Sequence, residues 1–110
     1  MKKRAPTRQD IVLSLANGTI GEIYPAIRQI SFRYNKEKKA LYLLVYLDRE
    51  PREDDYETAR YISGNVFGDY WGFFESIQEE CIYSTAPQNK LDPLDGILYA
   101  RREYDLEDVS

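Results

Sequence analysis

The segment from Asp48 to Glu57 carries the densest set of chemically active side chains in the sequence. It reads DREPREDDYE, which places six carboxylates within ten residues. Hard cations such as Ca²⁺ prefer several oxygen ligands, but the segment lacks the Asp-x-Asp-x-Asp-Gly order of a calcium loop, and Arg49 and Arg52 neutralise part of its charge. We therefore predict no metal site and no cofactor, and interpret the segment as a charged surface.

Catalysis of the common kinds has little basis in this composition. The chain has no histidine and one cysteine, Cys81, which excludes Ser-His and Cys-His nucleophile pairs. Cys81 lies in a strand-like run, where a packed core thiol is the expectation. Adjacent carboxylates such as Glu79 and Glu80 diverge in direction and make a poor acid-base pair. We predict that the protein is not an enzyme and has no catalytic residue.

The charge is distributed unevenly along the chain. The formal net charge is −4, yet residues 1–10 carry four basic side chains and one acidic one, whereas residues 11–110 carry 11 basic and 18 acidic ones. An acidic body repels a phosphate backbone and speeds association with a cationic partner. We therefore predict a basic protein as partner and no direct contact with nucleic acid.

The spacing of apolar residues predicts six elements that position these groups. We expect a helix over residues 7–17, strands over 26–34 and 41–47, a helix from the acidic segment to about residue 72, and strands over 73–84 and 97–102. The order is α-β-β-α-β-β, and the first two strands should form a hairpin. The predicted fold class is α+β, an antiparallel sheet of about four strands packed by two helices.

Local signals refine these expectations. Thr7 and Asp10 approximate a capping box, and Asn17-Gly18 is typical of a helix end. Pro51 fits the first turn of the second helix, and Gly64 and Gly68 permit close approach to a strand. The run Leu41–Leu47 is apolar on both faces, which is typical of a central strand covered on both sides.

The chain is expected to form one domain, residues 1–110, with flexible ends at 1–6 and 104–110. It lacks the apolar run of about 7–15 residues that a signal peptide requires and the longer run that a membrane span requires. One cysteine cannot form an internal disulfide. We therefore predict a cytoplasmic protein without membrane contact.

Three segments resemble a family of small bacterial immunity proteins that neutralise the toxin domains of contact-dependent growth inhibition systems. They are GEIYPAIR at 21–28, LLVYLDRE at 43–50 before the acidic helix start, and GILYARRE at 96–103. The resemblance implies a cytoplasmic, non-catalytic protein that is specific for one cognate toxin, commonly a nuclease. Toxin-facing residues vary between such pairs, so the resemblance assigns no binding residue.

Candidate binding residues follow from charge and side-chain chemistry instead. Ten tyrosines are present, and tyrosine supplies large, stiff contact area at interfaces. A nuclease holds phosphate in a cationic cleft, which carboxylates and aromatic rings can occupy as mimics of phosphate and base. The predicted charged contacts are Asp48, Glu50, Glu53, Asp54, Asp55 and Glu57. The predicted aromatic anchors are Tyr46, Tyr56, Tyr61 and Trp71.

Two other classes of function stay open at this point. A non-catalytic adaptor or homo-oligomeric assembly subunit could use an edge strand of the sheet to associate with itself. A carboxylate-based or metal-dependent enzyme would need a concave site with converging acids. The sequence leaves the oligomeric state open.

Overall fold

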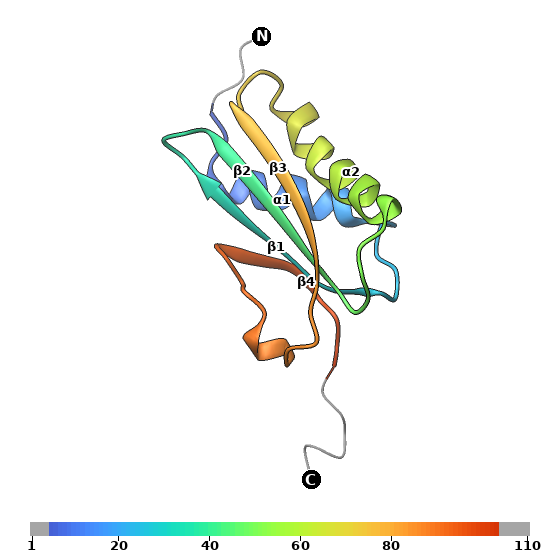
Figure 1. Ribbon diagram of the computed structural model, residues 1–110. Helices are drawn as coiled ribbons and strands as arrows, with labels where there is room; N and C mark the ends of the chain where they lie inside the picture. The colour runs from blue at the N-terminus through green and yellow to red at the C-terminus, as the bar shows by residue number, and fades with distance from the viewer. Residues whose placement is uncertain (1–4, 104–110) are drawn as a thin grey trace.

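The computed structural model describes residues 5–103, which form two helices and a four-stranded sheet (Figure 1). The elements are α1 (Arg8–Thr19), β1 (Ile27–Asn35), β2 (Ala40–Leu47), α2 (Glu53–Asp69), β3 (Ser76–Tyr83), a short 3₁₀ helix η1 (Gln88–Lys90) and β4 (Gly96–Ala100). The predicted α+β class and element order are confirmed. Most of the predicted flexible ends, residues 1–4 and 104–110, lies outside the described part.

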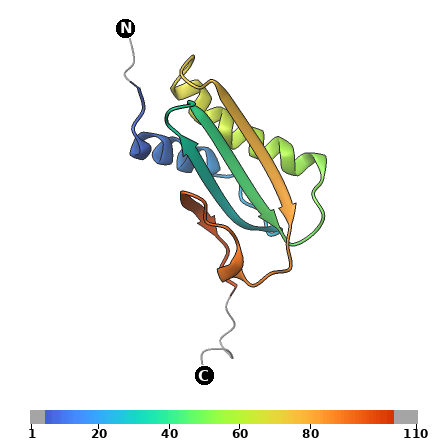
Figure 2. The ribbon, with the colours of Figure 1, turned by 60° about the vertical axis from the view of Figure 1, so that its left-hand side comes forward.

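The sequence predicts an antiparallel sheet, but the sheet is mixed. Its strand order is β3-β2-β1-β4. The β1–β2 hairpin and the β1–β4 pair are antiparallel, whereas β2 and β3 run parallel. The physical reason is α2, which carries the chain back along the sheet between β2 and β3, as a parallel pair requires. Both helices lie on one face of the sheet (Figures 1 and 2).

The start of α1 is fixed by the predicted capping box. The Asp10 backbone N–H donates to Thr7 Oγ1 at 3.1 Å, and the Thr7 N–H donates to Asp10 Oδ2 at 2.9 Å. The helix does not end at Asn17-Gly18 but continues to Thr19. Gly18 is buried where α1 crosses α2, and a Cβ at this position would lie 2.8 Å from the Ile62 carbonyl oxygen. Gly18 therefore serves helix packing rather than helix termination.

The core lies between the helices and the sheet. Alternate residues of β2 face the helices and are almost fully buried, together with apolar side chains from β1, α1 and α2. The buried core residues are Ile11, Leu15, Ile27, Ile30, Phe32, Leu41, Leu43, Val45, Leu47, Ala59, Ile62, Val66 and Cys81. Burial raises the pKa of the Cys81 thiol to about 12, so the expected core thiol is confirmed.

The face of the sheet opposite the helices is partly covered by the β3–β4 connection. The Asp92 carbonyl oxygen accepts hydrogen bonds from Gln29 Nε2 at 3.1 Å and from Ser31 Oγ at 3.0 Å. Leu44 of β2 and Leu91 of the connection are buried. The predicted cover on both sides of the central strand β2 is thus complete toward the helices and partial on the other face, where Tyr42 and Tyr46 are half-buried.

Three expectations about α2 are wrong. Pro51 precedes the helix, which begins at Glu53 after the N-cap residue Arg52. Gly64 and Gly68 approach no strand, because a Cβ at either position would meet open space. Phe67 recurs in the sequence at helical spacing with Ala59 and Val66, which predicts a place on the stripe that packs on the sheet, but its side chain is exposed. None of the helices described between residues 5 and 103 is long and apolar enough to cross a membrane.

Candidate functional site

The connection from β2 to α2 is held by an ion pair between Arg49 and Asp55. Arg49 Nη1 lies 2.8 Å from Asp55 Oδ2, and Arg49 Nη2 lies 3.1 Å from Asp55 Oδ1. Asp55 Oδ2 also accepts the backbone N–H of Arg52 at 2.6 Å. This last bond satisfies a backbone donor at the helix start. One carboxylate thus fixes both the loop and the first turn of α2.

Asp55 is buried, which corrects its prediction as a surface contact. Its exposed fraction is 1%, and its Oδ1 also accepts the Tyr24 hydroxyl proton. Burial alone would raise the pKa of Asp55, but the hydrogen bonds from Arg49, Tyr24 and the Arg52 backbone outweigh it and lower the pKa to about 2. The same site raises the pKa of Tyr24, through burial first and then its bond to Asp55. Asp55 is therefore a structural group.

Asp48 is exposed but already has a cationic partner. Arg101 Nη1 lies 2.7 Å from Asp48 Oδ2 and also donates to the Pro25 carbonyl at 2.6 Å. Arg101 and the buried Arg28 share the Glu103 carboxylate, with Arg28 Nε 2.7 Å from Glu103 Oε2. These alternating charges tie the end of β4 to β1 and β2. Asp48 thus belongs to this network as well as to the surface.

The other predicted acids surround the start of α2 in open solvent. Glu50, Glu53, Asp54 and Glu57 are all exposed, and we call these four residues the acidic surface. Glu53 pairs with Arg60 at 2.8 Å, but both side chains are largely exposed, and such pairs contribute little stability. Carboxylates in the first turn also complement the positive end of the helix dipole. The structure places these four predicted residues together.

The four predicted aromatic anchors separate into two kinds. Tyr46 and Tyr56 are half-buried and their hydroxyls are engaged, Tyr46 accepting the Asp92 N–H at 3.1 Å and Tyr56 donating to the Cys81 carbonyl at 3.4 Å. Tyr46 also lies on the sheet face opposite α2. Tyr61 and Trp71, in contrast, are 63% and 76% exposed. The structure therefore brings only Tyr61 and Trp71 near the outer side of α2.

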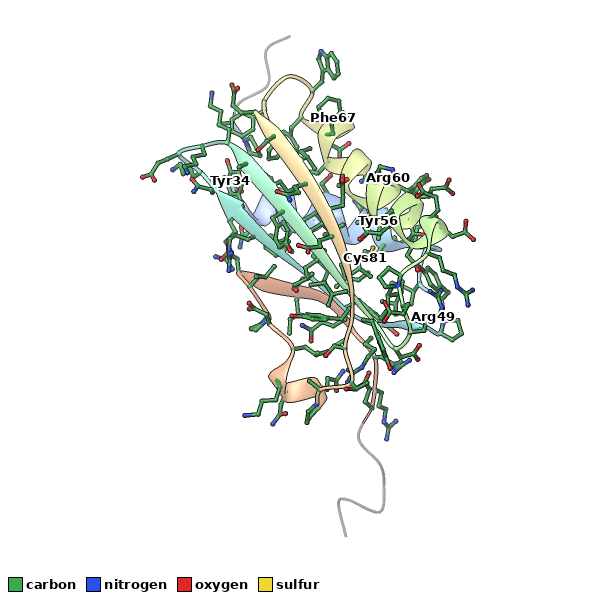
Figure 3. All side chains as sticks on the ribbon, viewed as in Figure 1. Tyr34, Arg49, Tyr56, Arg60, Phe67 and Cys81 are labelled. Atoms are coloured by element: carbon green, nitrogen blue, oxygen red, sulfur yellow. The ribbon has the colours of Figure 1, made fainter. Side chains whose placement is uncertain are left out.

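Sequence reasoning missed one aromatic residue of this region. Phe67 is 39% exposed, and its ring packs edge to face on Trp71 with ring centroids 5.2 Å apart. In Figure 3, Arg49 lies beside the start of α2 and Phe67 near the other end of the helix. The spacing of Ala59, Ile62 and Val66 indicates the exposure of Phe67, because Phe67 lies about 100° beyond Val66 around the helix axis.

A family model for MafI2 immunity proteins matches residues 8–103 of this chain. The chain belongs to the MafI2 immunity protein family. No curated protein sequence matches the chain. The predicted immunity-protein class is thereby confirmed: the chain neutralises a toxin, and its partner is a cognate toxin protein.

Two hollows among the described residues of this MafI2 immunity protein are open and mainly polar. One, of about 410 Å³, lies over the network of Arg28, Asp48, Arg101 and Glu103. Its charged groups already bond to one another. Within residues 5–103, no three Cys, Asp or Glu side chains converge as a metal site needs. What the described residues around α2 expose is a set of carboxylates and aromatic rings.

Proposed function

We propose that this MafI2 immunity protein neutralises a nuclease toxin of a contact-dependent growth inhibition system, in the cytoplasm, by binding it without catalysis through the acidic surface. The observation that carries the proposal is the set of four exposed carboxylates around the start of α2, Glu50, Glu53, Asp54 and Glu57. They lie on a frame that the buried Asp55 holds.

Electrostatics favours a nuclease as the toxin. An enzyme that binds nucleic acid presents a cationic cleft to the phosphate backbone. Carboxylates can occupy such a cleft in place of phosphate groups, and binding costs less conformational entropy when the backbone that carries them is already ordered. Charge of this kind mainly raises the rate of association and fixes orientation. Aromatic contacts then set the lifetime of the complex.

Co-expression tests the proposal directly. The chain is produced with the toxin domain encoded immediately upstream of its gene, and three readouts are taken: growth, co-purification, and cleavage of DNA and RNA by the purified toxin with and without the chain. We expect restored growth, a one-to-one complex, and nucleic-acid cleavage that stops at equimolar chain. A toxin that cleaves neither nucleic acid, yet is neutralised, would remove the nuclease part of the proposal. If the folded chain neither binds the toxin nor restores growth, the whole proposal is wrong.

An assembly role is the second candidate, because β3 lies at one edge of the described sheet. Its eight residues, Ser76–Tyr83, pair with β2 alone among the described strands. An edge strand is a template for pairing with a second copy of the chain. Light scattering of the purified chain distinguishes the two roles. A monomer that forms a one-to-one complex only when the toxin is added supports immunity. A homodimer that persists at all protein concentrations supports assembly.

A further inference from the structure

The C-terminal half of α2 and the turn that follows it hold aromatic side chains that face outward instead of into the core. Tyr61, Phe67 and Trp71 are exposed, and together with Gly64 and Gly68 we call them the aromatic face. On helical geometry, Tyr61, Gly64 and Gly68 lie on the side of α2 away from the buried Ala59, Ile62 and Val66. Exposed apolar side chains that gather on one surface mark a site of interaction, and here the Phe67 and Trp71 rings are in contact.

Gly64 and Gly68 leave the helix backbone bare between these rings. A Cβ at either position would have no heavy atom within 4 Å, beyond the helix backbone and chain neighbours. Glycine is less favourable than alanine inside a helix, and packing within the molecule supplies no reason for it here. Gly18 differs, because a Cβ there would lie 2.8 Å from the Ile62 carbonyl. Close approach of a second molecule would supply the missing reason for Gly64 and Gly68.

The charge along α2 indicates the chemistry of that second molecule. The first turn contains Glu53, Asp54 and Asp55, and the last turn has no basic residue. Glu57 lies one turn before Tyr61 on the same side of the helix, and residues 61–68, YISGNVFG, carry no charge. A complementary partner is therefore apolar opposite the C-terminal half of α2 and basic opposite its N-terminal half.

We propose that the aromatic face receives an apolar helix of the cognate toxin, whose neighbouring basic residues meet the acidic surface. The inference rests on the proposed function and adds a second surface to the proposed contact with the toxin. Positions four apart lie one above another on a helix, so Gly64 and Gly68 form a shallow groove along the axis, with Tyr61 on one side and Phe67 on the other. A ridge of side chains on a facing helix fits a groove of this direction.

The test measures binding kinetics of the full chain with the cognate toxin domain. Gly64→Ala/Gly68→Ala fills the groove with two methyl groups in a helix that tolerates them, and Trp71→Ala removes the most exposed ring. Ile97→Ala, which truncates an exposed side chain of β4 at the other edge of the sheet, is the matched control. We expect dissociation at least tenfold faster for both aromatic-face variants, association rates within about twofold, and no change for Ile97→Ala.

The outcomes separate this inference from the proposed function. Unchanged dissociation of both aromatic-face variants from a toxin that binds the wild-type chain would overturn the aromatic face as a contact and leave neutralisation intact. Absence of any wild-type complex would overturn both. Because Gly64→Ala/Gly68→Ala should fold at least as stably as the wild-type chain, circular dichroism and thermal unfolding of the free variant show that faster dissociation comes from the contact.

Discussion

Arg49 and Asp55 meet through two hydrogen bonds, of 2.8 and 3.1 Å, across the turn that joins β2 to α2. Asp55 is buried and Arg49 is partly exposed, so the pair joins the protein interior to its surface. The same carboxylate accepts the Arg52 N–H and the Tyr24 hydroxyl. The position of the acidic surface therefore depends on a residue that is not itself part of that surface.

Replacement of Asp55 should destabilise the fold. Asp55→Asn removes the charge that Arg49 and the helix start share, and we expect the free energy of unfolding to fall by about 2–3 kcal/mol. Urea unfolding followed by circular dichroism measures it. Asp54→Asn, at the exposed neighbouring position, is the control and should change stability by less than about 0.5 kcal/mol. Equal effects of the two substitutions would contradict the structural role of Asp55.

Stability should decrease at acid pH, in part through Asp55. Its pKa is about 2 in the folded chain against an ordinary value of 3.8, so the folded state favours the ionised form. That stabilisation is complete above the unfolded pKa and is lost as the pH falls from about 5 toward 2. Urea unfolding at several pH values should show a shallower decrease for Asp55→Asn than for the wild-type chain. Parallel curves would mean that Asp55 is not the titrating group.

Two glycines should respond oppositely to alanine. Gly18→Ala places a Cβ 2.8 Å from the Ile62 carbonyl and 3.0 Å from Asn65 Cβ, and we expect a loss of about 1–3 kcal/mol from forced separation of the helices. Gly64→Ala meets open space and should gain up to about 1 kcal/mol from helix propensity. Thermal unfolding of both variants measures the difference. A loss of stability in both would contradict the described packing of α2.

The network at the end of β4 should also contribute to stability. Glu103 accepts Arg28 Nε at 2.7 Å, and Arg28 Nη1 donates to the Ser84 carbonyl at 2.8 Å. The hydrogen bonds from Arg28 lower the pKa of Glu103. Glu103→Gln should reduce stability by about 1–2 kcal/mol, measured by urea unfolding with Glu37→Gln in the exposed β1–β2 turn as control. An unchanged midpoint would show that β4 is held without this pair.

Much of the fold could be predicted because its signals are local. Thr7 and Asp10 satisfy each other three residues apart, and the unbroken apolar run of β2 needs only its own residues to indicate burial on both faces. No local signal indicates the direction of β3, because that direction depends on where α2 ends relative to the sheet. One contact between α2 and β3 illustrates this: the Tyr56 hydroxyl donates to the Cys81 carbonyl, which the spacing of residues in the sequence does not predict.

The candidate site was predicted only in part, for reasons of geometry. Asp54 and Asp55 have the same charge, but Asp55 lies four residues before Ala59 and seven before Ile62, which places it on the buried stripe of α2. That periodicity was available in the sequence. Two of its partners were not, because Tyr24 and Arg49 lie 31 and six residues away along the chain. The contribution of the individual surface residues to toxin binding stays a prediction.

The association rate of the chain with its toxin, measured by stopped flow at increasing ionic strength, tests the role of the acidic surface most directly. The variant is Glu50→Lys/Glu57→Lys, which spares the first turn of α2 and Asp55. The control is Glu37→Lys/Glu75→Lys, which makes the same change in charge at exposed positions in the β1–β2 turn and next to it. We expect association of the variant to be at least tenfold slower than that of the control at low salt, with a weaker salt dependence. Equal rates and equal salt dependence for the two variants would contradict the acidic surface as the site that meets the toxin.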